Sequence, residues 1–206
     1  MNATEEALNR LSREAQGQVL AALDRYEDGT ITLDEFRAVV ASFVLAANGQ
    51  GYVIGYTTTR RAIEELTGLP EVPRVPDHDG KVPHHLDPDR ISKALVTIGV
   101  AEGARMRLGR LVDGEAKEAA ADGTRDVITG SKRVKGWVRS LDSDACELCR
   151  WWWREGRVWR PDFTMPRHTG CTCTQTPVVT TTDNYQTTEQ ARGAGEARAR
   201  RERSRA

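Results

Sequence analysis

The chain has 206 residues, and its 30 lysines and arginines balance 30 aspartates and glutamates, so the formal net charge is zero. Hydrophobic residues make up 38% of the sequence and the mean hydropathy is −0.57. This composition predicts folding around a modest core and excludes a fully disordered chain. The length excludes a large multidomain enzyme and fits one core-forming unit, or a helical body with a small appendage.

No stretch predicts a membrane span or a secretory leader. The most apolar run, residues 38–47, reaches about half of the ~20 residues that a transmembrane helix needs. The first six residues lack the basic segment followed by an apolar segment that a secretory signal requires. We therefore expect no membrane contact and assembly in a cytoplasm.

The zero net charge hides a gradient along the chain. Residues 1–80 hold 7 basic and 13 acidic side chains, whereas residues 81–206 hold 23 basic and 17 acidic ones. Such asymmetry predicts different neighbours for the two ends of the chain, with protein at the acidic front and a polyanion at the basic back.

Two long helices are predicted in the first third of the chain. Apolar residues recur at helical spacing over residues 4–25, which indicates one amphipathic helix. Thr32 and Glu35 have the spacing of a capping box, and the apolar pattern after them predicts a second helix to Leu66. Glycines inside it each cost about 1 kcal/mol relative to alanine, so we expect a break or a close helix contact there. These glycines are Gly49, Gly51 and Gly55.

A proline-rich loop separates these helices from two more. Five prolines in residues 70–88 can neither continue a helix nor donate fully to a sheet. Pro88 suits a first helical turn, and the apolar spacing after it predicts a third helix to Leu111. A shorter fourth helix is expected over residues 114–121 and beyond.

The pattern changes to short β-prone pieces only after Gly136, notably residues 136–140 and 157–159. The sequence therefore predicts a mainly α protein, with an elongated helical bundle or hairpin body followed by a small α+β module that resembles a zinc knuckle and by an arginine-rich tail. The predicted ranges of these three parts are 1–132, 133–179 and 180–206.

All four cysteines lie within 28 residues. Cys146 and Cys149 are spaced i, i+3, and after eighteen intervening residues His168 and Cys171 repeat that spacing, with Cys173 close behind. Zinc ribbons use two such pairs because each pair forms a tight turn that aims both ligands at one ion. We expect a structural zinc ion on the two equally spaced pairs, or on a set in which Cys173 replaces His168.

Other chemistry is open to the same residues. The cysteines can form two disulfides or simply pack, although a cytoplasmic origin disfavours disulfides during folding. A catalytic zinc needs an open coordination position and a general base, and the candidate base Glu147 lies inside the first ligand turn. A nucleophilic cysteine with His168 as its base is disfavoured because four clustered thiols indicate a shared ion.

Two further patterns, one acidic and one with histidines, resemble metal sites but have simpler structural interpretations. Residues 24–35 partly match a calcium-binding EF-hand loop, but Tyr26 occupies a ligand position and the motif is unpaired, so we favour a helix–turn–helix corner. His84 and His85 lie near two aspartates and suggest a weak second metal site, but adjacent loop histidines are usually exposed to solvent.

Aromatic and basic residues gather in the last third of the chain. All five tryptophans lie within residues 137–159 with arginines among them, a pattern that suits burial against the metal module or a protein interface, or stacking of single-stranded nucleic acid. The tail has the stronger pattern for nonspecific contact with DNA. The candidate contact residues there are Arg198, Arg200, Arg201, Arg203 and Arg205.

Three segments together resemble a known family. They are Val134–Arg139, Cys146–Cys149 and Arg167–Thr174. The combination of a Gly-Trp strand, a C-x-x-C pair, an H-x-x-C-x-C segment and a β-prone end is similar to the C-terminal module of tailed-phage minor head proteins, the Mu F-like head-morphogenesis and actinobacteriophage minor capsid proteins. Thr169-Gly170 stands where that family commonly has Pro-Asn.

The resemblance implies a structural virion protein inside the capsid at or near the portal vertex, assembled in the host cytoplasm and acting in head assembly or in DNA packaging or delivery. Its implied partners are the portal protein and the major capsid protein, with packaged DNA as a further partner of the basic tail. The competing interpretations are a capsid maturation protease and a DNA-binding zinc module. The chain offers no recognisable Ser–His constellation for a protease.

Overall fold

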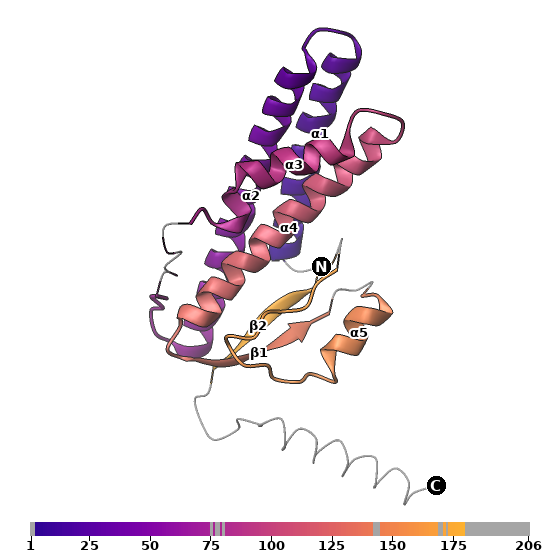
Figure 1. Cartoon of the computed structure of the whole chain (residues 1–206). Helices are drawn as coiled ribbons and strands as arrows, with labels where there is room; N and C mark the ends of the chain where they lie inside the picture. The colour runs from indigo at the N-terminus through magenta and orange to yellow at the C-terminus, as the bar shows by residue number, and fades with distance from the viewer. Residues whose placement is uncertain are drawn as a thin grey trace, which may run out of the picture.

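A computed structural model describes residues 3–74, 76, 79, 81–141, 145–168, 171 and 173–179. This part of the chain is mainly helical, as predicted, and α1 to α4 form an elongated body beside a two-stranded sheet and α5 (Figure 1). The elements in chain order are α1 (Ala3–Glu27), α2 (Leu33–Thr67), the 3-10 helix η1 (His84–Leu86), α3 (Pro88–Ile98), α4 (Ala104–Gly130), β1 (Val134–Ser140), α5 (Glu147–Trp153) and β2 (Thr174–Val179).

The first two helices form the predicted hairpin. The capping box at the start of α2 is present: the Glu35 N–H donates to the Thr32 hydroxyl at 3.3 Å, and the Thr32 N–H donates to the Glu35 carboxylate at 2.8 Å. Gly68 ends α2 in the left-handed conformation, with φ of 66°. The predicted helix boundaries are therefore confirmed to within a few residues at both ends.

The glycines of α2 mark a close helix contact and not a break. Gly51 and Gly55 lie against the carbonyl groups of Ala116 and Ala120 on α4, so close that a Cβ at either glycine would meet that backbone. Gly49 faces open space. Because side chains are absent at the crossing, the backbones of α2 and α4 approach each other closely over several turns.

The predicted third and fourth helices are wrong in their boundaries. α3 ends at Ile98, and the chain turns through Gly99 and Gly103, whose φ angles are 62° and 78°. α4 then runs without interruption over 27 residues. The apolar spacing continues across the turn because α3 and α4 both face the same core, so periodicity alone did not reveal the break.

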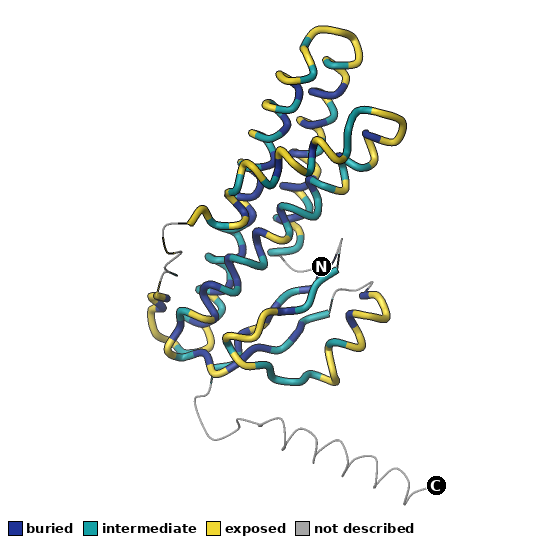
Figure 2. Tube along the Cα trace, viewed as in Figure 1, coloured by how far each residue is buried: buried dark blue, intermediate teal, exposed yellow. Residues whose placement is uncertain are grey.

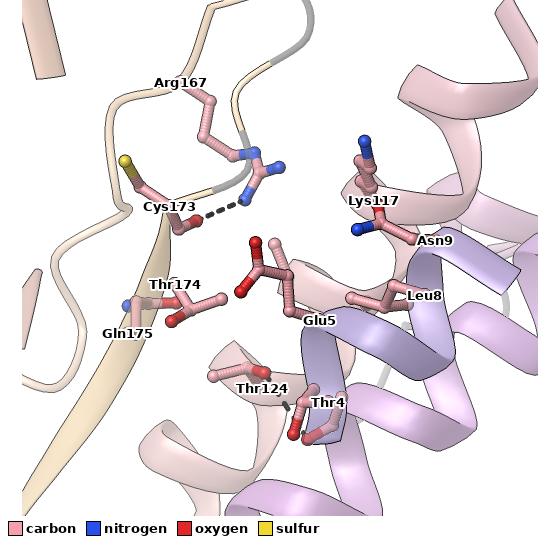
Figure 3. A pocket seen from close by; sticks show the side chains of 13 residues that line it. Thr4, Glu5, Leu8, Asn9, Lys117, Thr124, Arg167, Cys173, Thr174 and Gln175 are labelled. Atoms are coloured by element: carbon pink, nitrogen blue, oxygen red, sulfur yellow. Dashed lines mark hydrogen bonds between the residues drawn. The ribbon is translucent and has the colours of Figure 1, made fainter. Parts of the chain in front are cut away.

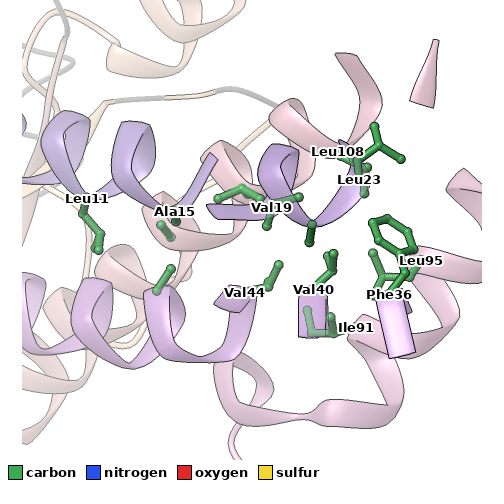
Figure 4. Packing of buried hydrophobic residues seen from close by; sticks show 14 residues of the cluster. Leu11, Ala15, Val19, Leu23, Phe36, Val40, Val44, Ile91, Leu95 and Leu108 are labelled. Atoms are coloured by element: carbon green, nitrogen blue, oxygen red, sulfur yellow. The ribbon is translucent and has the colours of Figure 1, made fainter. Parts of the chain in front are cut away.

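The main core lies between α1, α2, α3 and α4. Figure 2 shows the buried positions on the inner faces of these helices, and Figure 4 shows their side chains meeting. Val19, Val40, Val44 and Val112 are completely buried there. These branched side chains meet across helices, which accounts for the amphipathic pattern of residues 4–25.

A second hydrophobic cluster joins the helical body to the β1–β2 region. Ile63 of α2 and Val127 and Ile128 of α4 pack with Trp137 of β1 and with Met165. All five side chains are buried. The lower ends of α2 and α4 therefore supply the apolar surface on which β1 and the segment before His168 rest.

The sheet is an antiparallel pair of strands far apart in sequence. Val134 pairs with Val179 and Ser140 with Thr174, and an irregularity between Val134 and Gly136 shifts the register. The predicted β-prone piece at residues 136–140 thus lies in a paired strand. The other predicted piece, residues 157–159, contributes one isolated bridge between Trp137 and Trp159.

Among the described helices, α2 is the one long and apolar enough to cross a membrane by length and composition. The sequence interpretation considered only residues 38–47 and therefore missed this property. α2 packs against both α1 and α4, and its buried Asn48 donates to the Glu115 carboxylate of α4 at 3.0 Å. Buried helices in the cores of globular bundles have the same length and apolar composition.

Candidate metal centre

The first ligand pair lies at the start of a short helix that the sequence did not predict. Cys146 is the N-cap of α5, and its Sγ accepts the N–H of Cys149 at 3.5 Å. The i, i+3 spacing places both sulfur atoms on one side of the first helical turn. Cys146 is exposed and Cys149 is buried, so the pair extends from the surface inward.

The second ligand segment directly precedes β2. The Cys171 N–H donates to the His168 carbonyl at 3.0 Å, which closes a turn, and Cys173 stands one residue before the strand. Because β2 pairs with β1, the strand pairing brings this segment to α5 across more than twenty residues of sequence. Both predicted ligand segments therefore meet at one place.

The donor atoms lie at distances that suit one metal ion. His168 Nε2 is 3.1 Å from Cys146 Sγ and 3.2 Å from Cys149 Sγ, and Cys149 Sγ is 3.5 Å from Cys171 Sγ. A tetrahedral zinc ion with bonds of about 2.0–2.3 Å requires donor separations of roughly 3.5–3.8 Å. The observed separations are at or slightly below this range, so an expansion of a few tenths of an ångström would give the tetrahedral geometry.

Five donors form two overlapping groups. Cys146, Cys149 and His168 make one group, and Cys149, Cys171 and Cys173 make the other, with all donor atoms in each group within 4.8 Å of one another. Cys149 belongs to both groups and is the centre of the cluster. The structure thus brings together every residue that the sequence proposed as a ligand.

All four cysteines are free thiols in this structure, so neither of the two disulfides considered from the sequence is formed. A disulfide bond joins sulfur atoms at about 2.05 Å, whereas Cys149 and Cys171 are 3.5 Å apart. The same geometry disfavours a single activated thiol, because His168 contacts two sulfur atoms equally and orients toward the cluster as a whole.

The thiols differ in their affinity for protons. The pKa of Cys171 falls to about 4 because Cys173 hydrogen-bonds to it and because the Arg167 charge lies nearby, although burial opposes both effects. The pKa of Cys146 is lowered, chiefly by the bond from the Cys149 N–H. Burial raises the pKa of Cys149 to about 11. A bound cation favours the thiolate form of each ligand, Cys149 included.

Arg139 is the site residue that sequence reasoning missed. Its side chain is only 1% exposed, and its Nη1 donates to Cys149 Sγ at 3.7 Å and to Cys171 Sγ at 3.8 Å. Its other terminal nitrogen donates to the Pro166 carbonyl. The sequence interpretation grouped this arginine with the others beside the tryptophans, and only the inward phase of β1 distinguishes it from them.

The tryptophans divide between burial and exposure. Trp137 is buried in the second cluster and donates to the Phe163 carbonyl at 3.1 Å. Trp152 stacks on the His168 ring with a centroid separation of 6.3 Å. Trp151 is 58% exposed and carries the Arg154 guanidinium over its ring at 4.3 Å. Trp152 therefore packs against the metal module, while Trp151 faces outward.

An open pocket borders the centre on the side of the helical body (Figure 3). The first turn of α1 lies opposite Arg167 and residues 173–175 across this pocket, and Figure 3 shows the Glu5 carboxylate pointing toward the Arg167 guanidinium. Arg167 also donates to the carbonyls of Cys171 and Cys173, at 2.7 and 3.4 Å. The acidic start of the chain thus lies beside the metal-binding segment.

The remaining candidates lie elsewhere. In the EF-hand-like loop, the Glu35 carboxylate caps α2 and Asp28 accepts from Thr30, in keeping with a helix corner. His85 is not solvent-facing as expected: it is buried and stacks on Tyr52 with a centroid separation of 4.3 Å. The five tail arginines lie outside the described residues: Arg198, Arg200, Arg201, Arg203 and Arg205.

Comparisons were made with protein-family models, with curated proteins and with solved structures. None of them matches this chain. The Cys/His cluster, the fold around it and the motif resemblance are therefore the features that bear on function.

Proposed function

We propose that the chain is a non-enzymatic structural protein of a tailed-phage head, in which one zinc ion holds the C-terminal module together. The observation that carries this proposal is the meeting of the C-x-x-C and H-x-x-C-x-C segments between β1 and β2. The motif that resembles Mu F-like head proteins is, in this fold, one compact cluster of donors and not three scattered segments.

Zinc is the ion that these donors suit best. Thiolates and an imidazole in tetrahedral arrangement are typical of structural zinc sites, and four protein ligands leave no position for a substrate. Among the described residues, the hydrophobic cluster around the cysteines has four buried members, with Leu141 and Trp152 packed against it: Ala145, Cys149, Cys171 and Cys173. So small a core needs metal-binding energy to keep its shape.

Metal removal tests this part of the proposal. The purified chain is expected to contain one equivalent of zinc. A strong chelator should change tryptophan fluorescence, because all five tryptophans lie within residues 137–159, and should leave most of the helical circular dichroism in place, because the main core contains none of the ligands. Recovery of the original fluorescence on addition of Zn²⁺, but not of Ca²⁺, is the control. Protein that binds no zinc while all four thiols are reduced would refute the zinc centre.

The location in the particle follows from the resemblance and is supported by the shape and charge of the chain. An elongated helical body with an acidic front offers a surface for the portal protein or the major capsid protein. A reconstruction of the phage particle should show density for the chain inside the capsid at the portal vertex. Density on the outer shell, or its absence from the particle, would overturn this assignment.

A proteolytic function is the outcome that would overturn the non-enzymatic role. Incubation of the purified chain with immature major capsid protein is expected to leave that protein intact. Specific cleavage that a single Ser or His substitution abolishes would instead identify a maturation protease.

Contact with packaged DNA is a second proposed role, favoured by the six arginines among the last fifteen residues. Binding of duplex DNA should weaken steeply as salt rises, because each neutralised phosphate releases a counterion. A variant that ends at residue 179 should lose most of that binding. Equal binding by the full and shortened chains would assign the arginines another role.

A further inference from the structure

We infer, on the basis of the proposed metal centre, that Arg139 is the buried counter-ion of that centre and that its single charge selects a donor set of three thiolates and one imidazole. The ligands are then Cys146, Cys149, His168 and Cys171, and Cys173 is the donor left over.

The guanidinium of Arg139 is held against the sulfur atoms from several sides. β1 carries the side chain inward, and Nη1 donates to both Cys149 Sγ and Cys171 Sγ, at 3.7 and 3.8 Å. The Pro166 carbonyl accepts a hydrogen bond from the other terminal nitrogen, Nη2. The centroid of the Trp152 ring lies 5.3 Å from the guanidinium carbon. One donor group thus bridges one sulfur atom from each ligand segment.

This buried charge has no carboxylate partner in the part of the chain that the structure describes. An arginine stays charged at any ordinary pH, and a buried charge that nothing neutralises is strongly destabilising. Its nitrogen atoms donate to one neutral carbonyl and to the sulfur atoms of Cys149 and Cys171. The neutralising charge therefore belongs to the metal–thiolate cluster.

The neighbouring Arg167 contacts the ligand segment through backbone carbonyls and not through sulfur atoms. Its guanidinium donates to the carbonyls of Cys171 and Cys173, and the Glu5 carboxylate points toward it across the pocket (Figure 3). Arg167 is half-buried and its charge lies near the Cys171 thiol, but its guanidinium makes no sulfur contact among the described contacts. Arg139 is thus the arginine that is fully buried and donates to the sulfur atoms of the centre.

The charge balance then separates the two candidate donor sets. A divalent ion with three thiolates and a neutral imidazole carries a net charge of −1, and four thiolates carry −2. Arg139 brings the first set to neutrality and leaves the second with an uncompensated charge. His168 Nε2 lies within 3.2 Å of both Cys146 and Cys149 sulfur atoms, as the first set requires.

The test of the counter-ion role measures zinc affinity of the full chain by competition with a chromophoric chelator. R139M removes the charge at similar length and should weaken zinc binding about 10- to 100-fold, as outer-sphere substitutions do. R139K keeps the charge and should restore most of that loss. The control is R157M, because Arg157 stacks on Trp159 at 4.3 Å and no sulfur contact of its guanidinium occurs among the described contacts.

The result that would overturn the role is an R139M chain with unchanged zinc affinity and normal circular dichroism. If R139M does not fold, R139K decides: affinity within about threefold of the unaltered chain supports the role of the charge, and a tenfold loss contradicts it. A failure of the unaltered chain to bind zinc at all would instead refute the metal centre itself, so the two failures are distinguishable.

The donor set is tested by the absorption spectrum of the Co²⁺-loaded chain. C173S should keep both the wild-type spectrum and the zinc affinity, whereas H168A should change the d–d bands and weaken binding. The opposite pattern, with C173S altered and H168A unchanged, would establish a four-thiolate centre and overturn the selection by Arg139.

Discussion

The contact between α2 and α4 makes a prediction in which one substitution has opposite effects at two positions of the same helix. An alanine Cβ at Gly55 would lie 2.7 Å from the Ala120 carbonyl carbon and 2.9 Å from its Cα, and contacts below 3.0 Å essentially never occur. Overpacking of this kind costs about 3 kcal/mol, and the helix propensity of alanine offsets about 1 kcal/mol. G55A should therefore destabilise the chain by about 2 kcal/mol.

The matched control is G49A, because nothing lies within 4 Å of a Cβ at Gly49. This variant keeps the propensity gain and should be more stable by about 0.5–1 kcal/mol. Urea unfolding followed by circular dichroism, with zinc in excess, measures both changes, and thermal midpoints should move by roughly 2–4 °C per kcal/mol. Equal stability of G55A and the unaltered chain, or destabilisation by both variants, would refute the close-contact interpretation.

Two further predictions concern α2 and α4. Burial raises the pKa of Glu115, but its bonds from Arg90 and Asn48 outweigh burial and hold the pKa below its usual value. Its folded-state pKa is therefore lower than its unfolded-state pKa, so its contribution to stability is present above about pH 4.5 and disappears as the pH falls through the folded-state value. E115Q should cost about 1.5–3 kcal/mol at pH 7, with a smaller difference near pH 3, and a difference independent of pH in urea titrations would contradict this reasoning. T32A removes the α2 N-cap and should cost about 1 kcal/mol in the same assay, whereas T57A inside α2 should not; similar losses for both would argue against the cap.

Local signals in the sequence were enough for several elements of the fold. The capping box at Thr32 and the glycine at position 68 predict the ends of α2 because each acts through its own backbone neighbours. The ligand spacing of Cys146 and Cys149 is likewise local, since it depends on a single turn. Structural features that depend only on residues close in sequence can be predicted without knowledge of the rest of the chain.

Other features depended on contacts between segments far apart in sequence. Periodicity could not show that the chain reverses at Gly99, because the same core faces both helices that flank it. The burial of His85 depends on Tyr52, a residue more than thirty positions away. The sequence did not predict α5, whose first turn is capped by Cys146.

The sequence by itself determined that α1 and α2 form, how α2 begins and ends, and which five side chains are candidates for a metal ion. The tertiary structure decided that these side chains meet, because the pairing of β1 with β2 brings Cys171 to α5. It also decided that Arg139 faces them, because a strand directs alternate residues to opposite faces and only the packed structure shows which face is enclosed.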